Sequence, residues 1–150
     1  MNILIIEDET AAAVNLQSIL KKVAPSYNIL AILESIEESI EYFSNKSNIY
    51  PDLVFMDIHL ADGESFHIFD KVEITAPIVF TTAYDEYALR AFKVNSIDYI
   101  LKPIKEEDLQ HAIAKLAQLS GQERSEYQSR VENMVENSSR ENQRVFLVHY

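Results

Sequence analysis

Side chains able to handle a phosphoryl group follow the short apolar segments of this sequence. Glu7 and Asp8 come after the run NILII, Asp57 after LVFM, Thr82 after IVFT and Lys102 after DYIL. If these segments are parallel strands of one sheet, their carboxyl ends meet at one edge and bring the five side chains together. An aspartate can then act as a nucleophile, while a lysine and a hydroxyl stabilise the oxygens of the transferred group. The spacing predicts a phosphoryl-transfer site in which Asp57 is the acceptor.

The clustered carboxylates also predict a metal site. Acidic groups packed together repel one another, so the cluster calls for a compensating cation. The chain has no cysteine, and its 4 histidines lack the mutual spacing of a zinc site, so the expected ligands are hard oxygens. One or two carboxylates completed by water and a phosphoryl oxygen suit Mg²⁺ better than Ca²⁺. We therefore expect Mg²⁺ to bind at Asp8 and Asp57.

Each of these residues also has a purely structural explanation. An acidic pair after a strand is often a helix N-cap, a threonine there is often a turn residue, and a lysine is often a solvated strand end. The combination favours the site, because the acids, the hydroxyl and the lysine all fall at the ends of predicted strands.

Strand–helix repeats position these residues. Short apolar runs alternate with stretches of helical period, a pattern typical of a parallel sheet with helices on both faces. The predicted strands are Ile3–Ile6, Ile29–Leu33, Leu53–Met56, Ile78–Thr81 and Ile97–Leu101. The predicted helices carry the stripe Leu16, Ile19, Leu20 and Val23, a capping box at Ser35–Glu38, the residues Phe66, Phe69 and Val72, the segment Tyr87–Val94, and the stripe Leu109, Ile113 and Leu116.

The composition bounds the class of protein. With 150 residues and 47% apolar content, the chain is long enough for one domain with a core but not for two. A formal charge of -11 argues against direct binding of nucleic acid, which is held through Lys and Arg. No apolar run approaches the ~20 residues of a membrane span, and the chain begins with acid where a signal peptide is basic. We expect a soluble, cytoplasmic protein without membrane contact.

The composition changes after Gly121. Residues 122–144 are mostly polar, which is typical of a linker or a weakly amphipathic helix, and residues 145–150 return to a strand-like apolar run. We expect a domain over residues 1–121, a linker over 122–144 and the first strand of a further domain at 145–150.

From Met1 to about Leu119 the sequence resembles the receiver domain of bacterial two-component response regulators. The family's positions are matched residue by residue: its acidic pair by Glu7 and Asp8, its phosphoacceptor by Asp57 in FMDI, its switch hydroxyl by Thr82 before Ala83, and its lysine by Lys102 before Pro103. The resemblance implies the CheY-like, flavodoxin-like α/β fold, a doubly wound, five-stranded parallel sheet of order 2-1-3-4-5 with five helices.

The resemblance also implies what binds at the site. Mg²⁺ is held by Asp8, Asp57 and the backbone carbonyl of His59, while Glu7 acts mainly through water. A sensor histidine kinase supplies the phosphoryl group. The protein is then a phosphorylated switch, and not an enzyme that turns over a substrate.

Three further positions bear on the resemblance. Tyr99, three residues before Lys102, matches the aromatic side chain that changes orientation on activation. The peptide bond between Lys102 and Pro103 is expected to be cis. Gly63 departs from the commonest receiver pattern, because it comes only six residues after Asp57 and shortens the loop there.

The segment FTTAYDEYALRAFKVNSIDYILKPI, residues 80–104, further resembles the subgroup whose output domain is the LytTR (LytR/AlgR-type) DNA-binding domain. On this basis residues 145–150 begin a truncated output domain that regulates transcription, and DNA is bound there and not by the receiver. Phosphorylation is expected to pair two receivers as a homodimer through the surface around Tyr87, Ala91 and Val94. The alternative is a receiver that blocks its output domain until it is phosphorylated.

Other functions fit the sequence less well. An FMN carrier of the flavodoxin type needs phosphate-binding donors after the first strand, where this chain has Glu7–Glu9. Rossmann and P-loop enzymes need glycines there, and the only glycines are Gly63 and Gly121. A phosphatase of the haloacid dehalogenase type requires a second aspartate at the position of His59. A pseudo-receiver that only binds proteins stays open as the alternative, although the set of acids, Asp57, hydroxyl and lysine is intact.

Overall fold

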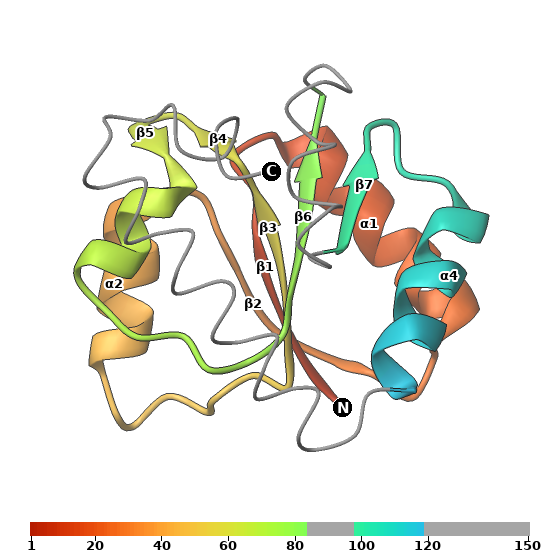
Figure 1. Ribbon diagram of the computed structural model, residues 1–150, viewed down its shortest axis with the longest axis horizontal. Coiled ribbons are helices and arrows are strands. Elements are labelled where there is room, and N and C mark those ends of the chain that lie inside the picture. The colour runs from red at the N-terminus through yellow and green to blue at the C-terminus, as the bar shows by residue number, and fades with distance from the viewer. Residues whose placement is uncertain (84–97, 119–150) are drawn as a thin grey trace.

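The computed structural model describes residues 1–83 and 98–118. Residues 84–97 and 119–150 are drawn as thin grey traces in Figure 1. The predicted helix over Tyr87–Val94, with its expected dimerisation surface, lies outside the described residues. So do the predicted linker at 122–144 and the predicted strand at 145–150.

Five parallel strands form one sheet through the centre of the fold (Figure 1). They lie in the order β2-β1-β3-β6-β7, which is 2-1-3-4-5 when the strands of this sheet are numbered alone, so the predicted fold class and strand order are confirmed. Each predicted strand end lies within one residue of the observed end. The strands are β1 (Asn2–Ile6), β2 (Asn28–Leu33), β3 (Leu53–Asp57), β6 (Ile78–Thr82) and β7 (Asp98–Leu101).

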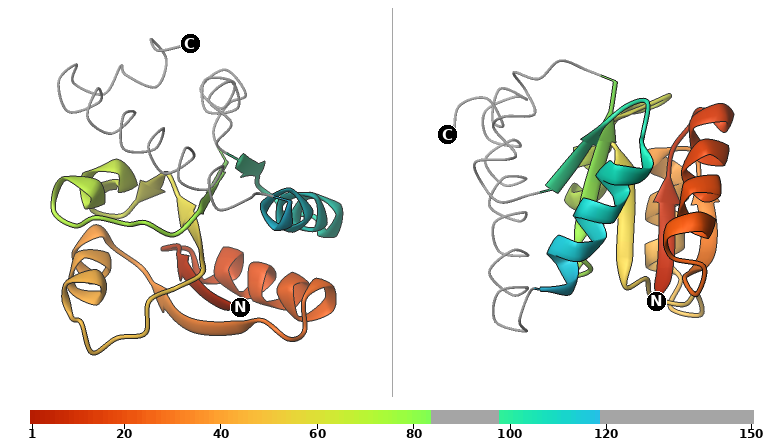
Figure 2. Two further views of the ribbon diagram at one scale, coloured as in Figure 1. Left: turned by 60° about the horizontal axis from the view of Figure 1, so that its bottom comes forward. Right: turned by 90° about the vertical axis from the view of Figure 1, so that its right-hand side faces the viewer.

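Helices cover both faces of the sheet, as the apolar runs predict (Figure 2). Helices α1 (Thr10–Val23) and α4 (Glu106–Ala117) lie on one face. Helix α2 (Ile36–Ser44) and the 3₁₀ helix η1 (Ser65–Asp70) lie on the other. Among the described residues, no helix has the length and apolar character that crossing a bilayer requires.

Alternate residues of the central strands enter two separate cores. Ile5 and Phe55 pack on the side of α1 and α4, whereas Ile6 and Met56 pack on the side of α2 and η1. All four are fully buried. A strand buried on both faces needs apolar residues at every position, which explains the continuous apolar runs in the sequence.

Helix α2 begins where the sequence predicts. Ser35 Oγ accepts a hydrogen bond from the Glu38 amide at 3.0 Å. The Glu38 carboxylate accepts one from the Glu34 amide at 2.9 Å, one residue earlier than in a standard capping box. The bond to Ser35 satisfies an amide that the first helical turn would otherwise leave unpaired, and the bond to Glu38 fixes the backbone just before the cap.

The segment after β3 differs from the prediction. A short antiparallel hairpin of β4 (His59–Leu60) and β5 (Gly63–Glu64) leads into η1, which ends at Asp70. The prediction of a regular helix reaching Val72 is therefore wrong.

The physical reason lies in the spacing and in one glycine. Phe66, Phe69 and Val72 recur every three residues, which matches the 3.0-residue turn of a 3₁₀ helix better than an α-helical turn. Gly63 has a φ of 135°, a conformation that other residues rarely adopt, and it allows the tight hairpin before η1. The shortened loop noted in the sequence is this hairpin.

Candidate functional site

The ends of four strands bring the predicted site residues to one edge of the sheet. The last residue of β3 is Asp57, the last residue of β6 is Thr82, and Lys102 directly follows β7. The acidic pair directly follows β1. The parallel register aligns these ends, since Asp57 is opposite Thr81 and Thr82 is opposite Leu101. Residues far apart in the sequence therefore meet at one place.

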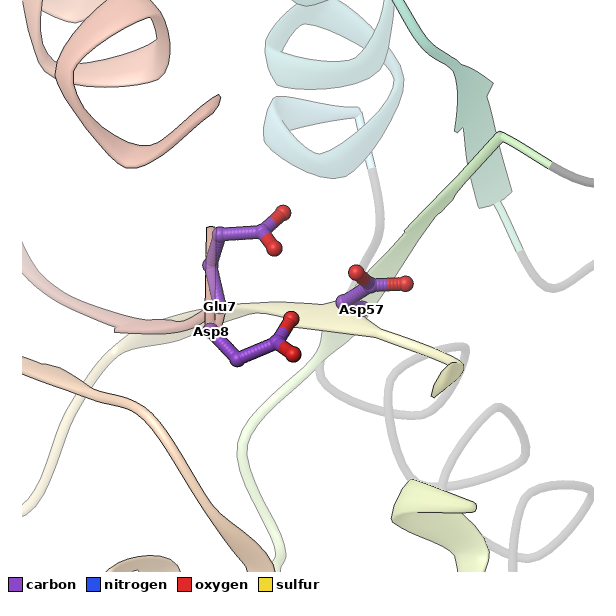
Figure 3. Close-up of side chains that lie close together, drawn as sticks. All are labelled: Glu7, Asp8 and Asp57. Carbon is purple, nitrogen blue, oxygen red and sulfur yellow. The ribbon is translucent and has the colours of Figure 1, made fainter. Parts of the chain in front are cut away.

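Three carboxylates form one cluster (Figure 3). One oxygen from each of Glu7, Asp8 and Asp57 lies within 4.8 Å of the other two. Glu7 and Asp57 are buried, and Asp8 is half-buried. In residues 1–83 and 98–118, these three form the one group of potential metal ligands gathered this closely. The expected acids thus lie together, with Asp8 the most accessible.

The Lys102 ammonium lies among the carboxylates. Its Nζ atom is 2.6 Å from Glu7 Oε1, 2.9 Å from Asp57 Oδ2 and 3.2 Å from Glu9 Oε1. The side chains of Lys102, Glu7 and Asp57 are 12%, 5% and 6% exposed, whereas that of Glu9 is 66% exposed. Because ion pairs shielded from water are stronger than exposed ones, the pairs with Glu7 and Asp57 dominate.

Burial and charge perturb two acid–base groups of the site. Burial, helped by the charge of Asp57, raises the pKa of the Glu7 carboxyl to about 7, although bonds from Lys102 and the Glu9 amide act to lower it. Burial also acts to lower the pKa of Lys102, but its hydrogen bonds to Glu7 and Asp57 outweigh burial and raise that pKa above its ordinary value. Lys102 is therefore charged at neutral pH and still leaves the carboxylates incompletely compensated.

The donor set fits Mg²⁺. The cluster offers several carboxylate oxygens and an excess of negative charge, which are the features that bind hard divalent cations. The raised pKa of Glu7 has burial as its main cause and the charge of the neighbouring Asp57 as a second one.

Thr82 and His59 lie beside the cluster. Thr82 is fully buried at the end of β6. The backbone amide of His59 donates a hydrogen bond to Asp57 Oδ1 at 3.2 Å. Both oxygens of Asp57 are thus engaged, Oδ1 by the following backbone and Oδ2 by Lys102.

Tyr99 and Pro103 occupy the last strand of the sheet and the turn after it. Tyr99 lies in β7, is half-buried and packs against the core on the side of α2 and η1. The peptide bond between Lys102 and Pro103 is cis, as expected. The Lys102 amide donates to the Thr82 carbonyl at 2.8 Å, which ties the lysine to the end of β6.

The role of Glu9 was missed in the sequence. Glu9 occupies the N-cap position of α1, but its side chain makes no cap hydrogen bond and pairs with Lys102 instead. The available signal was the third acid of the run Glu7–Glu9. Sequence alone could not tell an N-cap residue from the ion-pair partner of a lysine that follows a distant strand.

The comparisons with known proteins agree with this geometry. A family model described as the response regulator receiver domain matches residues 3–114. The sensory transduction protein LytT of Enterococcus faecalis is 42% identical over 125 residues, which cover 81% of this chain and 50% of that protein. The transcriptional regulatory protein BtsR of Salmonella typhi is 32% identical over 120 residues, covering 79% and 48%. The chain spans about half the length of these relatives.

Solved structures show the same fold. A two-component response regulator from Clostridium difficile matches with a TM-score of 0.62 and 31% identity, over 79% of this chain and 97% of that one. The response regulatory domain of protein mrkE from Klebsiella pneumoniae matches with a TM-score of 0.62 and 27% identity, over 78% and 95%. From its sequence relatives, its strand order and the acids at its strand ends, this chain belongs to the response regulator receiver family, among the receivers of the LytT and LytR type.

Proposed function

We propose that this chain is a phosphoryl-accepting switch, with Asp57 as the acceptor and a sensor histidine kinase as the donor. The observation that carries the proposal is the buried Asp57 carboxylate, placed between the acidic pair and the Lys102 ammonium. An Asp57 oxygen attacks the phosphorus of a phosphohistidine, so that an O–P bond forms and the P–N bond breaks. The histidine nitrogen leaves with the electron pair and takes a proton from solvent. The product is an aspartyl phosphate.

Asp8, Asp57 and the backbone carbonyl of His59 would hold Mg²⁺, with Glu7 acting through water. When bound, Mg²⁺ offsets the charge of the incoming phosphoryl group and helps to align it. The cluster of three carboxylates supports this assignment, because one oxygen from each of Glu7, Asp8 and Asp57 lies within 4.8 Å of the other two and Asp8 is the most accessible of the three.

Lys102 and Thr82 complete the site. The Lys102 ammonium pairs with phosphoryl oxygens in place of its present carboxylate partners, and the Thr82 hydroxyl donates a hydrogen bond to a further oxygen. As Thr82 moves toward the phosphoryl group, Tyr99 turns into the space that is left. The adjacent strands β6 and β7, which are paired at Phe80 and Tyr99, support this coupling. Phosphorylation thereby shifts the population between two states of this surface.

The switch acts on an attached output domain. The chain spans about half of its curated relatives, one of which is named a transcriptional regulatory protein. We propose a receiver over residues 1–121, a linker over 122–144 and a LytTR-type DNA-binding domain beginning at 145–150. DNA is bound by that domain and not by this acidic receiver, and paired receivers bring two output domains together as a homodimer.

Incorporation of a phosphoryl group tests the acceptor. With acetyl phosphate and Mg²⁺, intact-mass spectrometry should show one added phosphoryl group on the wild type and none on Asp57→Asn. Asp52→Asn is the matched control, because Asp52 precedes the same strand at its opposite end and should leave labelling unchanged. Equal labelling of wild type and Asp57→Asn overturns the proposal. Repeated turnover of a phosphate ester would favour a phosphatase, and a chain that never labels would favour a pseudo-receiver.

Sedimentation with and without beryllofluoride, a phosphoryl mimic, tests the pairing of receivers. The mimic should shift the protein toward a dimer. A protein that stays monomeric at high concentration with the mimic bound contradicts pairing and favours release of a blocked output domain.

A further inference from the structure

The hairpin of β4 and β5 begins at the phosphoryl-transfer site. His59 is opposite Glu64 in the hairpin, and the His59 amide donates to Asp57 Oδ1 at 3.2 Å. The Ser65 amide donates to the Ile58 carbonyl at 2.8 Å and closes the base of the hairpin. The backbone that carries the proposed carbonyl ligand is therefore the first strand of this hairpin.

The tip of the hairpin is fastened to helix α2. Asp62 Oδ1 accepts a hydrogen bond from the Ile36 amide at 2.9 Å, and Asp62 Oδ2 accepts one from the Glu37 amide at 3.3 Å. Helix α2 already has its own cap in Ser35, which binds the Glu38 amide. Asp62 supplies a second cap from a separate part of the chain, and its two hydrogen bonds link the hairpin to the helix.

Packing supports the same link. Gly63, next to Asp62, lies so close to α2 that a Cβ atom on it would be 3.3 Å from Ile36 Cδ1. Leu60 of the hairpin and Ile36 of the helix belong to one buried core cluster. Polar and apolar contacts thus converge on the first turn of α2.

We propose that Asp62 is a positioning residue for the metal site, which holds the hairpin on α2 so that the His59 carbonyl faces the carboxylate cluster. This inference rests on the proposed function, because it takes His59 as a ligand. A hairpin this short is not stable by itself, and it needs an outside anchor to keep a fixed shape. A ligand atom must be held within about 0.5 Å of its place to bind well. Asp62 lies outside the carboxylate cluster and acts through the backbone.

The experiment compares two caps of the same helix. Mg²⁺ is titrated into ¹⁵N-labelled protein, and the amide shifts of Asp57 and His59 report the dissociation constant. Asp62→Ala should weaken Mg²⁺ binding about tenfold, the lower end for loss of a group that orients a ligand. Asp62→Asn keeps an acceptor oxygen and should weaken binding less. Ser35→Ala removes a cap whose hydrogen bond lies within the same helical turn, so its Mg²⁺ affinity should match that of the wild type.

The outcomes separate the possible explanations. Asp62→Ala and Asp62→Asn remove the same charge, so equal weakening in both would mean that charge alone matters and would overturn the positioning role. Equal weakening by Ser35→Ala would assign the effect to general loss of helix stability and would also overturn it. Suppose that the wild type binds Mg²⁺, that Asp8→Asn abolishes the binding, and that Asp62→Ala still binds with the wild-type affinity. In that case the positioning role of Asp62 fails while the proposed metal site stands. If wild type shows no Mg²⁺-dependent shifts, the proposed metal site itself fails.

Discussion

Replacement of Lys102 by methionine tests the electrostatics of the site, because methionine keeps much of the side-chain length and removes the ammonium. Lys102 makes two shielded ion pairs, at 2.6 Å with Glu7 and at 2.9 Å with Asp57. Removal of one partner of a buried ion pair typically costs about 3–5 kcal/mol, since the other charge is left uncompensated. We expect the free energy of unfolding to fall by about 3 kcal/mol at pH 8, the low end of that range, because Glu7 can escape by binding a proton.

The pKa of Glu7 gives this prediction its pH dependence. That pKa is about 7 in the folded protein, against an ordinary value of 4.5. The folded state binds the proton more tightly, so the stability that Glu7 contributes is complete below pH 4.5 and is lost as the pH rises to about 7. Lys102 acts to lower this pKa, so the pKa of Glu7 should be higher in Lys102→Met. In that variant the free energy of unfolding should keep falling above pH 7, by up to about 1.4 kcal/mol per pH unit. The variant should therefore differ from wild type more at pH 8 than at pH 6.

The assay is urea unfolding followed by far-UV circular dichroism at pH 6 and pH 8, with a chelator present. Lys46→Met is the matched control, because Lys46 is exposed in the loop after α2. Excess Mg²⁺ at pH 8 should restore part of the stability lost by Lys102→Met, since the divalent cation replaces the missing charge. If Lys102→Met costs no more than Lys46→Met at pH 8, or costs the same at both pH values, the account of the site is wrong.

Two further predictions concern the metal and the hairpin. The Mg²⁺ affinity of the wild type should weaken by up to about tenfold per pH unit below pH 7, because the metal displaces the Glu7 proton, and Glu7→Gln should flatten this dependence in amide-shift titrations. If the Mg²⁺ affinity of Glu7→Gln depends on pH as strongly as that of the wild type, the proton that Mg²⁺ displaces is bound by a group other than Glu7. Gly63→Ala should lower the free energy of unfolding by about 1–3 kcal/mol, because alanine is strained at a φ of 135° and its Cβ would lie 3.3 Å from Ile36 Cδ1. An unchanged urea midpoint for Gly63→Ala would show that the hairpin adapts without strain.

The sheet and the positions of the site residues could be predicted from the sequence because their signals are local and reinforce one another. An apolar run that ends in a polar residue gives both a strand and the edge at which that residue lies, as for Asp57 and Thr82. The topology of a parallel sheet then brings the strand ends together without any knowledge of side-chain packing.

The same signals could not predict the hairpin, its hydrogen bonds to α2 or the ion pair between Glu9 and Lys102. The Asp62–Gly63 pair is a recognised turn signal, but its position beside α2 depends on how the sheet places two distant segments. Glu9 lies where a helix begins, and only the folded chain shows that its side chain pairs with Lys102 and makes no cap hydrogen bond. The apolar residues after Gly63 are compatible with either an α-helix or a 3₁₀ helix, and in the structure residues Ser65–Asp70 form a 3₁₀ helix.

The two halves of the site differ in how firmly the sheet holds them. Strand β3, which carries Asp57, is paired on both sides, with β1 and with β6, whereas β7, which precedes Lys102, pairs only with β6 among the described strands. Amides of a doubly paired, fully buried strand exchange with solvent only when the whole domain unfolds, while an edge strand can exchange through local opening. Amides of β3, on the Asp57 side of the site, should therefore be more strongly protected from exchange than amides of β7, on the Lys102 side.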